Sequence, residues 1–387
     1  AFEDKAYRYG INGLTFINIG INIVVMKLPD SLKIYSKEQN SAAQAQRHAQ
    51  EIAFAPVVFQ ISRLMVKYGI LNLLYQNPDG LTLSQIVEKI KLSEYAIKVL
   101  LEASLSIGTV IVENDKFFIT KTGWFLINDK IVGVNMNFNH YVNYNGLYYL
   151  DEALQNGKPE GLKVFGDWKT IYEGLSSLPQ EAQKYWFDFD HFYSDGAFNE
   201  ALGIVFPTKE DKITLLDVGG NTGRWALRCV DYNKNAEVTI LDLPTQLEMM
   251  KNNIKGKNGA DRIHAYPMNL LDSNAVFPDE KFDVIWMSQF LDCFSENEII
   301  EICSKAKKSM KENSRIYIME TFWDRQRYET AAYCLTLTSP YFTAMANGNS
   351  KMYHSGDMEK CVSKAGLSVE KIIDGIGMGH SLMICKL

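Results

Sequence analysis

Residues 213 to 226 read Ile213-Thr-Leu-Leu-Asp-Val-Gly-Gly-Asn-Thr-Gly-Arg-Trp-Ala226 and predict a buried strand, a glycine turn and the start of a helix. Glycine has no Cβ atom, so Gly219, Gly220 and Gly223 let the backbone come close to a ligand. A helix that begins near Arg224 would point its free N–H groups at the same place. The stretch therefore predicts an α/β domain with a site for a nucleotide-like ligand.

The next predicted strand ends in a carboxylate that narrows the class of ligand. Asp242 ends the segment Val238-Thr-Ile-Leu-Asp242, about twenty residues after the glycine turn, where a carboxylate can accept hydrogen bonds from both ribose hydroxyls. The glycines do not follow the dinucleotide spacing Gly-x-Gly-x-x-Gly, and no basic cluster is available for a pyrophosphate. We therefore expect a ribose-bearing cofactor. The alternative is a tight strand-to-helix turn that binds no ligand.

Further segments follow in a fixed order and carry a family resemblance. They are Leu216-Asp-Val-Gly-Gly-Asn-Thr-Gly223, Asp242-Leu-Pro244, Pro267-Met-Asn-Leu-Leu-Asp272 and Asp283-Val-Ile-Trp-Met-Ser-Gln-Phe-Leu291. With them the chain resembles the S-adenosylmethionine-dependent O-methyltransferases of small molecules. That family includes plant caffeate and flavonoid enzymes, hydroxyindole O-methyltransferase and bacterial polyketide-tailoring relatives. The resemblance covers the chain from about residue 55 to its end.

The resemblance implies both a fold and an activity. The expected fold class is α/β: a class I methyltransferase Rossmann-like doubly wound sheet with a reversed last strand, preceded by a mainly helical winged-helix dimerisation domain. The expected domains are residues 1–205, for dimerisation and the substrate pocket, and residues 206–387, for S-adenosyl-L-methionine binding and catalysis. The expected reaction is methyl transfer to a hydroxyl of an aromatic or polyketide-like small molecule by a homodimer.

The resemblance also assigns cofactor-binding roles to individual residues. Asp217, Gly219 and Gly223 would face the methionine and ribose portions of S-adenosylmethionine. Asp242 would accept the ribose hydroxyls, with Leu243 against the adenine.

Some cofactor positions depart from the family pattern. Asn221, next to Gly220 of the turn, stands where the family commonly has a third glycine. Asn269, which with Leu270 would hold the adenine, stands where the family commonly has aspartate. Ser288 corresponds to the usual lysine ahead of the catalytic segment. We expect the cofactor still to bind, with lower affinity.

The catalytic position carries the largest departure. The family has a histidine general base after the fourth strand, and the segment Phe290-Leu-Asp-Cys-Phe294 puts Asp292 in its place. A carboxyl with a pKa of about 4 is a poor base for a phenol unless burial raises that pKa. Glu320 matches one of the two acidic residues that flank the histidine, and the second falls at Met352. We expect Glu320 or His354 to assist Asp292.

Losing the histidine leaves a second function open. The alternative is a family member that binds S-adenosylmethionine but methylates nitrogen or carbon, or catalyses a reaction without methyl transfer. A further alternative is that Asp292 is a loop carboxylate with no role in the chemistry. For His354 the alternative is a position at the surface or in a loop.

Composition is consistent with an enzyme of two domains. The 387 residues are 47% hydrophobic, enough to bury a large core. A net charge of −6 argues against nucleic acid or an anionic membrane as the main partner. The six cysteines form no C-x-x-C pair, so we expect reduced thiols in a cytoplasmic protein and no metal site.

An apolar run from Ile11 to Leu28 approaches the length of a membrane span. It contains Asn12, Asn18 and Asn22 and lacks a basic preceding region, so neither a signal peptide nor an anchor is expected. We expect it to cover a partner subunit, and a membrane-associated tail is the alternative. Because the sequence begins with Ala1 and not methionine, residues ahead of it are also expected.

The segment from about 50 to 120 predicts a winged helix. A helix from Gln50 to Leu74 ends at the turn Asn77-Pro-Asp-Gly80, and two helices and a hairpin with its turn at Asn114-Asp115 follow. Because winged helices often bind DNA, a transcription regulator is a rival function. The helix 93–104 offers only Lys98 against Glu94 and Glu102, which favours contact with protein.

Two further regions complete the prediction. Residues 135–205 are rich in aromatic side chains, some of which we expect to line the acceptor pocket.

In the C-terminal region, strands are predicted near 213–218, 237–242, 261–266, 282–287, 314–319, 367–373 and 380–386. Ser295-Glu-Asn-Glu298 is a capping box for a helix expected to bury Ile299 and Met310. Gly375-x-Gly377-x-Gly379 is expected to be the loop of the final antiparallel hairpin.

Overall fold

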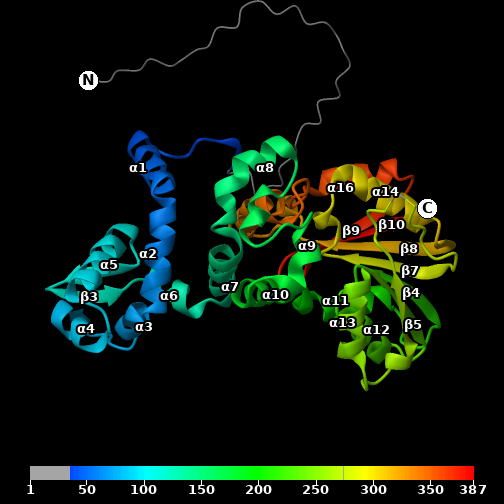
Figure 1. Cartoon of the computed structure of the whole chain (residues 1–387), viewed down its shortest axis with the longest axis horizontal. Helices are drawn as coiled ribbons and strands as arrows, with labels where there is room; N and C mark the ends of the chain where they lie inside the picture. Colours follow the sequence, from blue (N-terminus) through cyan, green and yellow to red (C-terminus); the bar gives the residue numbers. More distant parts are fainter. Residues whose placement is uncertain (1–34, 273) are drawn as a thin grey trace, which may run out of the picture.

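The computed structural model describes residues 35–272 and 274–387. The apolar run Ile11–Leu28 lies outside the described residues. A winged-helix region lies at one end of the molecule and a sheet domain at the other, with long helices between them (Figure 1). No helix in the described ranges is both long enough and apolar enough to cross a membrane.

The first region is the predicted winged helix. Its elements are α1 (Ala42–Ala53), α2 (Ala55–Lys67), α3 (Ile70–Tyr75), β1 (Leu81–Thr82), α4 (Leu83–Lys89), α5 (Glu94–Ile107), β2 (Val110–Glu113), β3 (Lys116–Ile119) and α6 (Lys121–Asn128). The strands form an antiparallel sheet in the order β1-β3-β2. Asn114 and Asp115 have φ of 48° and 61°, as a two-residue hairpin turn that follows strand twist requires.

The helix predicted from Gln50 to Leu74 is wrong in its extent. The chain forms three helices there, with breaks at Phe54 and at Gly69. Pro56 lies in the first turn of α2, where its missing N–H costs nothing. Gly69 has a φ of 73°, which a helix interior cannot accept.

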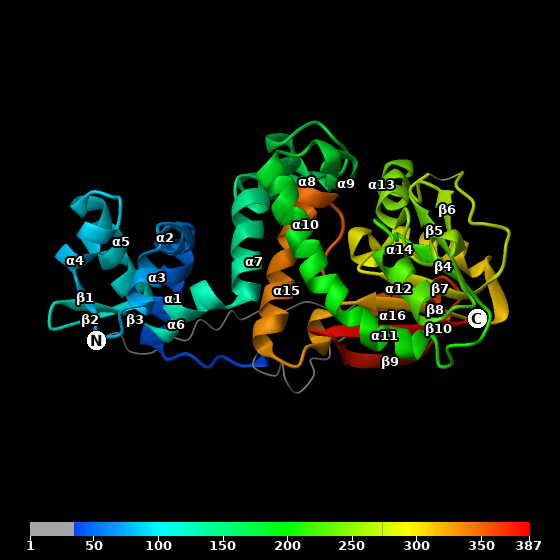
Figure 2. The same ribbon diagram turned by 90° about the horizontal axis from the view of Figure 1, so that it is seen from below.

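The middle of the chain forms a helical body. Its main elements are α7 (Lys130–Phe138), α8 (Leu150–Asn156), α9 (Ile171–Gly174), α10 (Gln180–Ser194) and α11 (Phe198–Val205). Figure 2 shows α7 and α10 beside α15 (Glu329–Tyr341), which comes much later in the sequence. Buried residues of these three helices form one apolar cluster, including Phe138, Trp186 and Leu335.

The domain boundary at 205/206 stays a prediction, and packing crosses it in both directions. Before the boundary, α11 buries Ala201 and Leu202 in the core of the sheet domain. After the boundary, α15 packs with the helical body.

The sheet domain has seven strands in the order β6-β5-β4-β7-β8-β10-β9. They are β4 (Ile213–Val218), β5 (Ala236–Asp242), β6 (Ile263–Pro267), β7 (Phe282–Ser288), β8 (Met310–Glu320), β9 (Ser368–Ile376) and β10 (His380–Lys386). The first five run parallel, and β10 is antiparallel to both of its neighbours. This confirms the seven predicted strands and the reversed last strand.

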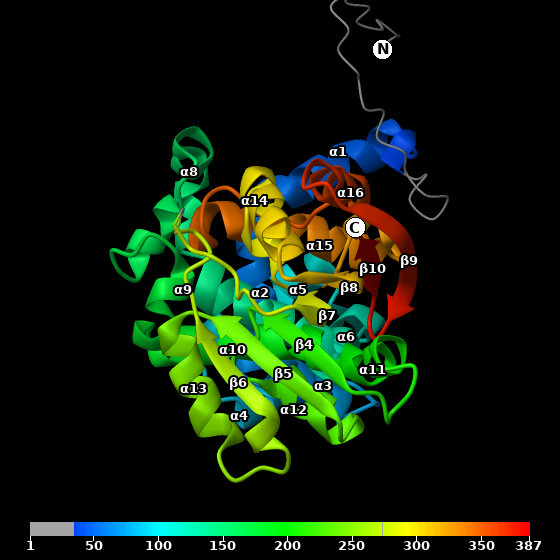
Figure 3. The same cartoon turned by 90° about the vertical axis from the view of Figure 1, so that its right-hand side faces the viewer.

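Helices cover both faces of the sheet, as a buried parallel sheet requires (Figure 3). Together with α11, α12 (Arg224–Tyr232) and α13 (Pro244–Ile254) pack on one face, and α14 (Glu296–Lys307) and α16 (Ser355–Lys364) pack on the other. The predicted capping box at Ser295 and Glu298 is present at α14. Met310, expected on the buried side of that helix, instead begins β8, because the helix ends at Lys307.

The strand order puts a crossover point beside β4. The chain moves from β4 through β5 to β6 on one side, then returns to β7 on the other. Ligands of such sheets bind at the carboxyl ends of the strands where the order reverses. The glycine turn after β4 is therefore the first candidate for a ligand-binding site.

Candidate active site

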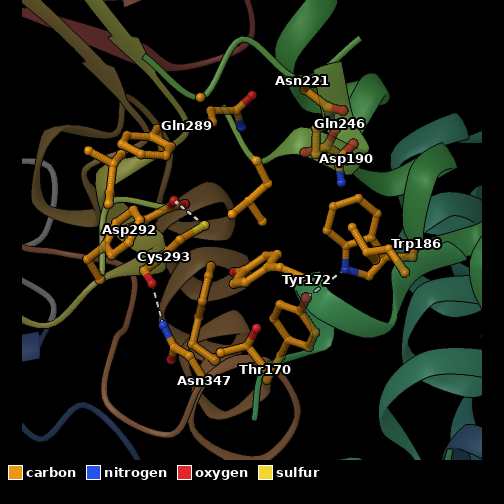
Figure 4. A pocket seen from close by; sticks show the side chains of 18 of the residues that line it. Thr170, Tyr172, Trp186, Asp190, Asn221, Gln246, Gln289, Asp292, Cys293 and Asn347 are labelled. Carbon is orange, nitrogen blue, oxygen red and sulfur yellow. Dashed lines mark hydrogen bonds between the residues drawn. The ribbon is translucent and has the colours of Figure 1, made fainter. Parts of the chain in front are cut away.

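A single cavity extends from the carboxyl ends of β4, β5 and β7 into the helical body (Figure 4). Its cofactor half is lined by residues of the sheet domain: Gly219, Asn221, Leu241, Asp242, Leu243, Gln246, Met268, Asn269, Leu270, Leu271, Gln289 and Phe290. Its acceptor half is lined mainly by helical residues: Phe138, Thr170, Tyr172, Glu173, Leu175, Trp186, Phe189, Asp190, Tyr193, Cys334, Leu335, Thr338, Tyr341, Phe342, Asn347, Asn349 and Met352. Asp292 and Cys293 lie where the halves meet.

The glycine turn has the geometry that its sequence predicts. Gly219 and Gly223 each have a φ of 75°, and Asn221 has a φ of 49°, a region that asparagine tolerates better than most residues. A Cβ atom at Gly219 would lie 2.2 Å from the Phe290 ring. Only glycine therefore fits at Gly219, and α12 begins directly after Gly223.

Asp242 ties this turn to the end of β5. Its Oδ2 accepts a hydrogen bond from the Asn221 N–H at 2.8 Å, and its Oδ1 accepts one from the Leu243 N–H at 2.7 Å. Burial raises the pKa of Asp242 to about 6, against these two hydrogen bonds, which lower it. A carboxylate has about four acceptor positions, so the carboxylate can still accept from ribose hydroxyls.

Four of the predicted cofactor residues do not line the cavity: Asp217, Gly220, Gly223 and Ser288. A Cβ atom at Gly220 would lie 2.5 Å from Oδ2 of Asp217. Burial, with the nearby Asp242, raises the pKa of Asp217 to about 8. The other six, Gly219, Asn221, Asp242, Leu243, Asn269 and Leu270, do line it. Their roles in binding stay predictions.

Sequence reasoning missed two glutamines of the cofactor half. Gln246 lies in the first turn of α13, and Gln289 follows β7 with a φ of 45°. Their Oε1 atoms and Oδ1 of Asn221 are buried and have no hydrogen-bond partner among the described residues. Figure 4 shows Asn221, Gln246 and Gln289 around one part of the cavity. Three such acceptors fit a ligand rich in donors, as the hydroxyls and ammonium of S-adenosylmethionine are.

The acceptor half has aromatic walls. The rings of Phe138 and Phe189 stack with centroids 3.9 Å apart, and Trp186 Nε1 donates to Tyr341 Oη at 2.7 Å. The expectation that some aromatic residues between 135 and 205 line a pocket agrees with this lining. Tyr341 and Phe342 were missed, because nothing in their local sequence connects them to residues about 150 positions earlier.

Asp292 lies at the junction on a single helical turn, Leu291–Cys293. Its side chain is buried, and Cys293 Sγ donates to its Oδ1 at 3.4 Å. Burial raises the pKa of Asp292 to about 6. The carbonyl of Cys293 accepts from Asn347 Nδ2, so the turn is also fixed from the acceptor half.

Glu320, at the end of β8, contacts the backbone of that turn and does not line the cavity. Its Oε1 accepts from the backbone N–H groups of Phe290 at 3.0 Å and Leu291 at 2.9 Å. Burial, with the neighbouring Asp292, raises the pKa of Glu320 well above its usual range. Glu320 is therefore placed to orient the Asp292 turn rather than to contact an acceptor.

The geometry does not support the expectation that His354 reaches the cavity. Its Nδ1 accepts from the Gly356 N–H at 2.9 Å as the cap of α16, and its Nε2 lies 3.5 Å from Asp324 Oδ2. The ring packs edge-on against Trp323. The side chain is thereby held at the helix start, and Met352 lines the cavity instead.

Comparisons with known proteins agree with this architecture. Residues 46–117 match the family model of the Dimerisation2-like domain, and residues 215–313 match that of the Methyltransferase domain. O-methyltransferase 7 of Dictyostelium discoideum is 21% identical over 316 residues, which cover 81% of this chain and 87% of that protein.

Solved structures show the same fold. The S-adenosylmethionine-dependent methyltransferase SibL has a TM-score of 0.65 at 18% identity, covering 87% of this chain and 97% of its own. Mitomycin 7-O-methyltransferase MmcR has a TM-score of 0.64 at 17% identity, covering 89% and 98%. The predicted fold class is confirmed.

Proposed function

We propose that this chain, a member of the S-adenosylmethionine-dependent small-molecule O-methyltransferase family, methylates a hydroxyl of an aromatic or polyketide-like small molecule. The matched methyltransferase domain and the O-methyltransferase relatives support the proposal. One observation carries it: a polar half at the strand ends and an aromatic half in the helical body form one continuous cavity, with a buried carboxyl at their junction. A methyl donor and an aromatic acceptor bound in these halves would meet at Asp292.

Binding and positioning are the main tasks of the protein. S-adenosylmethionine supplies a methyl group on a positively charged sulfur, so the reaction needs an aligned acceptor and a place for its proton. Asn221, Asp242, Gln246, Asn269 and Gln289 would hold the cofactor through its hydroxyl and amino groups. The aromatic walls would fix the plane of the acceptor and exclude water.

Asp292 is proposed to accept the proton of the acceptor hydroxyl. Its pKa of about 6 leaves most of the carboxyl ionised at neutral pH, while making it a stronger base than an exposed aspartate. Glu320 would hold the Asp292 turn through its two backbone hydrogen bonds. The geometry gives His354 no part in this step.

Assembly and location complete the proposal. Ile52, Phe54 and Val57 of the α1 and α2 region are 63%, 59% and 55% exposed, which with the Dimerisation2-like match supports a homodimer. Lys98 of α5 pairs with Glu94 at 2.7 Å, so this helix offers nucleic acid little positive charge, and no nucleic-acid partner is proposed.

The cysteines, all in the described part of the chain, are free, which supports a reducing, cytoplasmic location.

The test combines cofactor binding with identification of the product. Calorimetry should show that the protein binds S-adenosylhomocysteine, and incubation with phenolic compounds and methyl-labelled S-adenosylmethionine should give a methyl ether. Absence of cofactor binding would reject the proposal. Labelled methyl on nitrogen or carbon would establish the second candidate, which the aspartate in place of the family histidine favours.

A further inference from the structure

Tyr172 carries a buried hydroxyl group in the acceptor half of the cavity. It belongs to α9 and is part of the cavity lining. Its Oη atom is buried and has no hydrogen-bond partner among the described residues. The neighbouring Cys293 offers only a thiol, which is a weak acceptor and donates its own hydrogen to Asp292. Because buried polar groups are nearly always paired, this hydroxyl indicates a ligand atom as its partner.

A second tyrosine hydroxyl of the acceptor half also has a hydrogen to donate. Tyr341, at the end of α15, lines the cavity, and its Oη accepts a hydrogen bond from Trp186 Nε1 at 2.7 Å. Within the described ranges its own O–H group donates to no acceptor. Burial raises the pKa values of Tyr172 and Tyr341 well above their usual range. Both hydroxyls therefore keep their hydrogens at neutral pH and can act as donors.

Both hydroxyls lie near the junction at which the reaction is proposed to occur. Asp292 and Cys293 are electrostatic neighbours of Tyr172 and of Tyr341 alike. Figure 4 shows Tyr172 between Trp186 and Cys293, with Asp292 beyond Cys293. An acceptor whose hydroxyl reaches Asp292 would therefore bring the group next to that hydroxyl to the two tyrosines.

A carbonyl oxygen is the group that suits two O–H donors. It accepts two hydrogen bonds and donates none. A second hydroxyl would bring one more hydrogen to a place that already has two to donate. A carboxylate would bring negative charge close to the Asp292 carboxyl, and a hydrocarbon group would leave both tyrosine hydroxyls unpaired.

We infer that Tyr172 binds a carbonyl oxygen of the acceptor, with Tyr341 as the second donor, and that the methylated hydroxyl lies next to this carbonyl on the ring system. The acceptor is thus a hydroxyaryl ketone or a hydroxyquinone. Tyr172 is an acceptor-binding residue, and the proton of the hydroxyl still passes to Asp292. The inference rests on the proposed function, because it names the acceptor class of the same cavity.

Three small phenols test this inference by the position and presence of the carbonyl group. In 2-hydroxyacetophenone the carbonyl lies next to the hydroxyl, and in 3-hydroxyacetophenone it lies one ring position further away. In 2-isopropylphenol a methyl group replaces the carbonyl oxygen at nearly the same shape. Each is titrated, with detection by NMR, into protein saturated with S-adenosylhomocysteine, both for the wild type and for Tyr172→Phe.

Tyr172→Phe should weaken binding of 2-hydroxyacetophenone by about fivefold, the effect of one hydrogen bond between neutral groups. Binding of the other two phenols should change by less than about twofold, because neither places a carbonyl at Tyr172. Tyr148→Phe is the control, since Tyr148 is 86% exposed and does not line the cavity. It should leave the affinity for all three phenols unchanged.

The prior titration with S-adenosylhomocysteine separates two kinds of failure. If the wild type does not bind S-adenosylhomocysteine, the proposed function fails. If it does, the inference alone is overturned when 2-hydroxyacetophenone does not bind, when Tyr172→Phe leaves its affinity unchanged, or when all three phenols are weakened equally. Should Tyr172→Phe itself fail to bind S-adenosylhomocysteine, Tyr341→Phe takes its place with the same expected pattern.

Discussion

The two halves of the cavity are built in different ways. In the cofactor half, the loops that follow the strand ends supply backbone groups and small polar side chains. In the acceptor half, side chains from α7, α10 and α15 meet, although α10 and α15 are more than 130 residues apart in the sequence. The difference teaches that a cofactor shared by many proteins can be held by local backbone geometry, whereas acceptor choice depends on long-range packing.

The largest expected effect lies in the cofactor half. Asp242→Ala removes the charge-assisted hydrogen bonds from the N–H groups of Asn221 in the glycine turn and of Leu243 before α13, together with the acceptor for ribose. We expect affinity for S-adenosylhomocysteine to fall by about 100-fold or more, as measured by calorimetry. Asp231→Ala, at an exposed acid of α12, is the control. Unchanged affinity in a folded Asp242→Ala protein would mean that the cofactor binds elsewhere.

The junction between the halves should control the chemical step. Because Asp292 must be ionised to accept a proton, kcat should rise as pH increases through about 6 and stay level above it. Asp292→Asn should lower kcat by about 100-fold and abolish this rise, while binding of S-adenosylhomocysteine persists. Glu301→Gln, an exposed acid of α14, should keep the profile. If kcat of Asp292→Asn depends on pH as in the wild type, Asp292 is not the base.

A smaller effect is expected from a substitution in the acceptor half, which should weaken acceptor binding without changing cofactor binding. Trp186→Phe keeps an aromatic ring but loses the hydrogen bond to Tyr341 Oη, so the KM for acceptor should rise by about fivefold. Affinity for S-adenosylhomocysteine should stay as in the wild type. Trp124→Phe, at a tryptophan of α6 that is 39% exposed, controls for loss of an indole. Equal changes for both ligands would show that the halves do not act separately.

The smallest effect is expected at His354, outside both halves. His354→Ala removes the cap of α16 and should lower the free energy of unfolding by about 1 kcal/mol, as measured by denaturant titration. The profile of kcat against pH should not change. His264→Ala, at an exposed histidine of β6, is the control. A shifted pH profile in His354→Ala would restore the catalytic role that the sequence had suggested.

Local signals accounted for most of the fold. The strand, glycine and carboxylate pattern around Gly219 and Asp242 predicted the turn, because hydrophobic spacing and positive φ angles leave direct traces in a sequence. The same holds for the hairpin at Asn114 and for the capping box at Ser295. The errors were local as well: Pro56 and Gly69 divided one predicted helix into three.

The site was only partly predictable for a different reason. Gln246 and Gln289 carry no motif, and their amide oxygens reach the cavity only because α13 and the end of β7 lie on either side of the crossover point. For His354 the order of motifs suggested catalysis, but the side chain turns to cap α16.

The sequence by itself determined the strands, the glycine turn and the final hairpin, since each depends on residues close together in the chain. Its ordered motifs also carried the family resemblance that implied the reversed last strand, the cofactor and the place of Asp292. The tertiary structure alone placed Tyr341 beside Trp186 and kept His354 out of the cavity. Contacts of that kind depend on how distant helices pack, and packing of distant helices leaves no periodic trace in a single sequence.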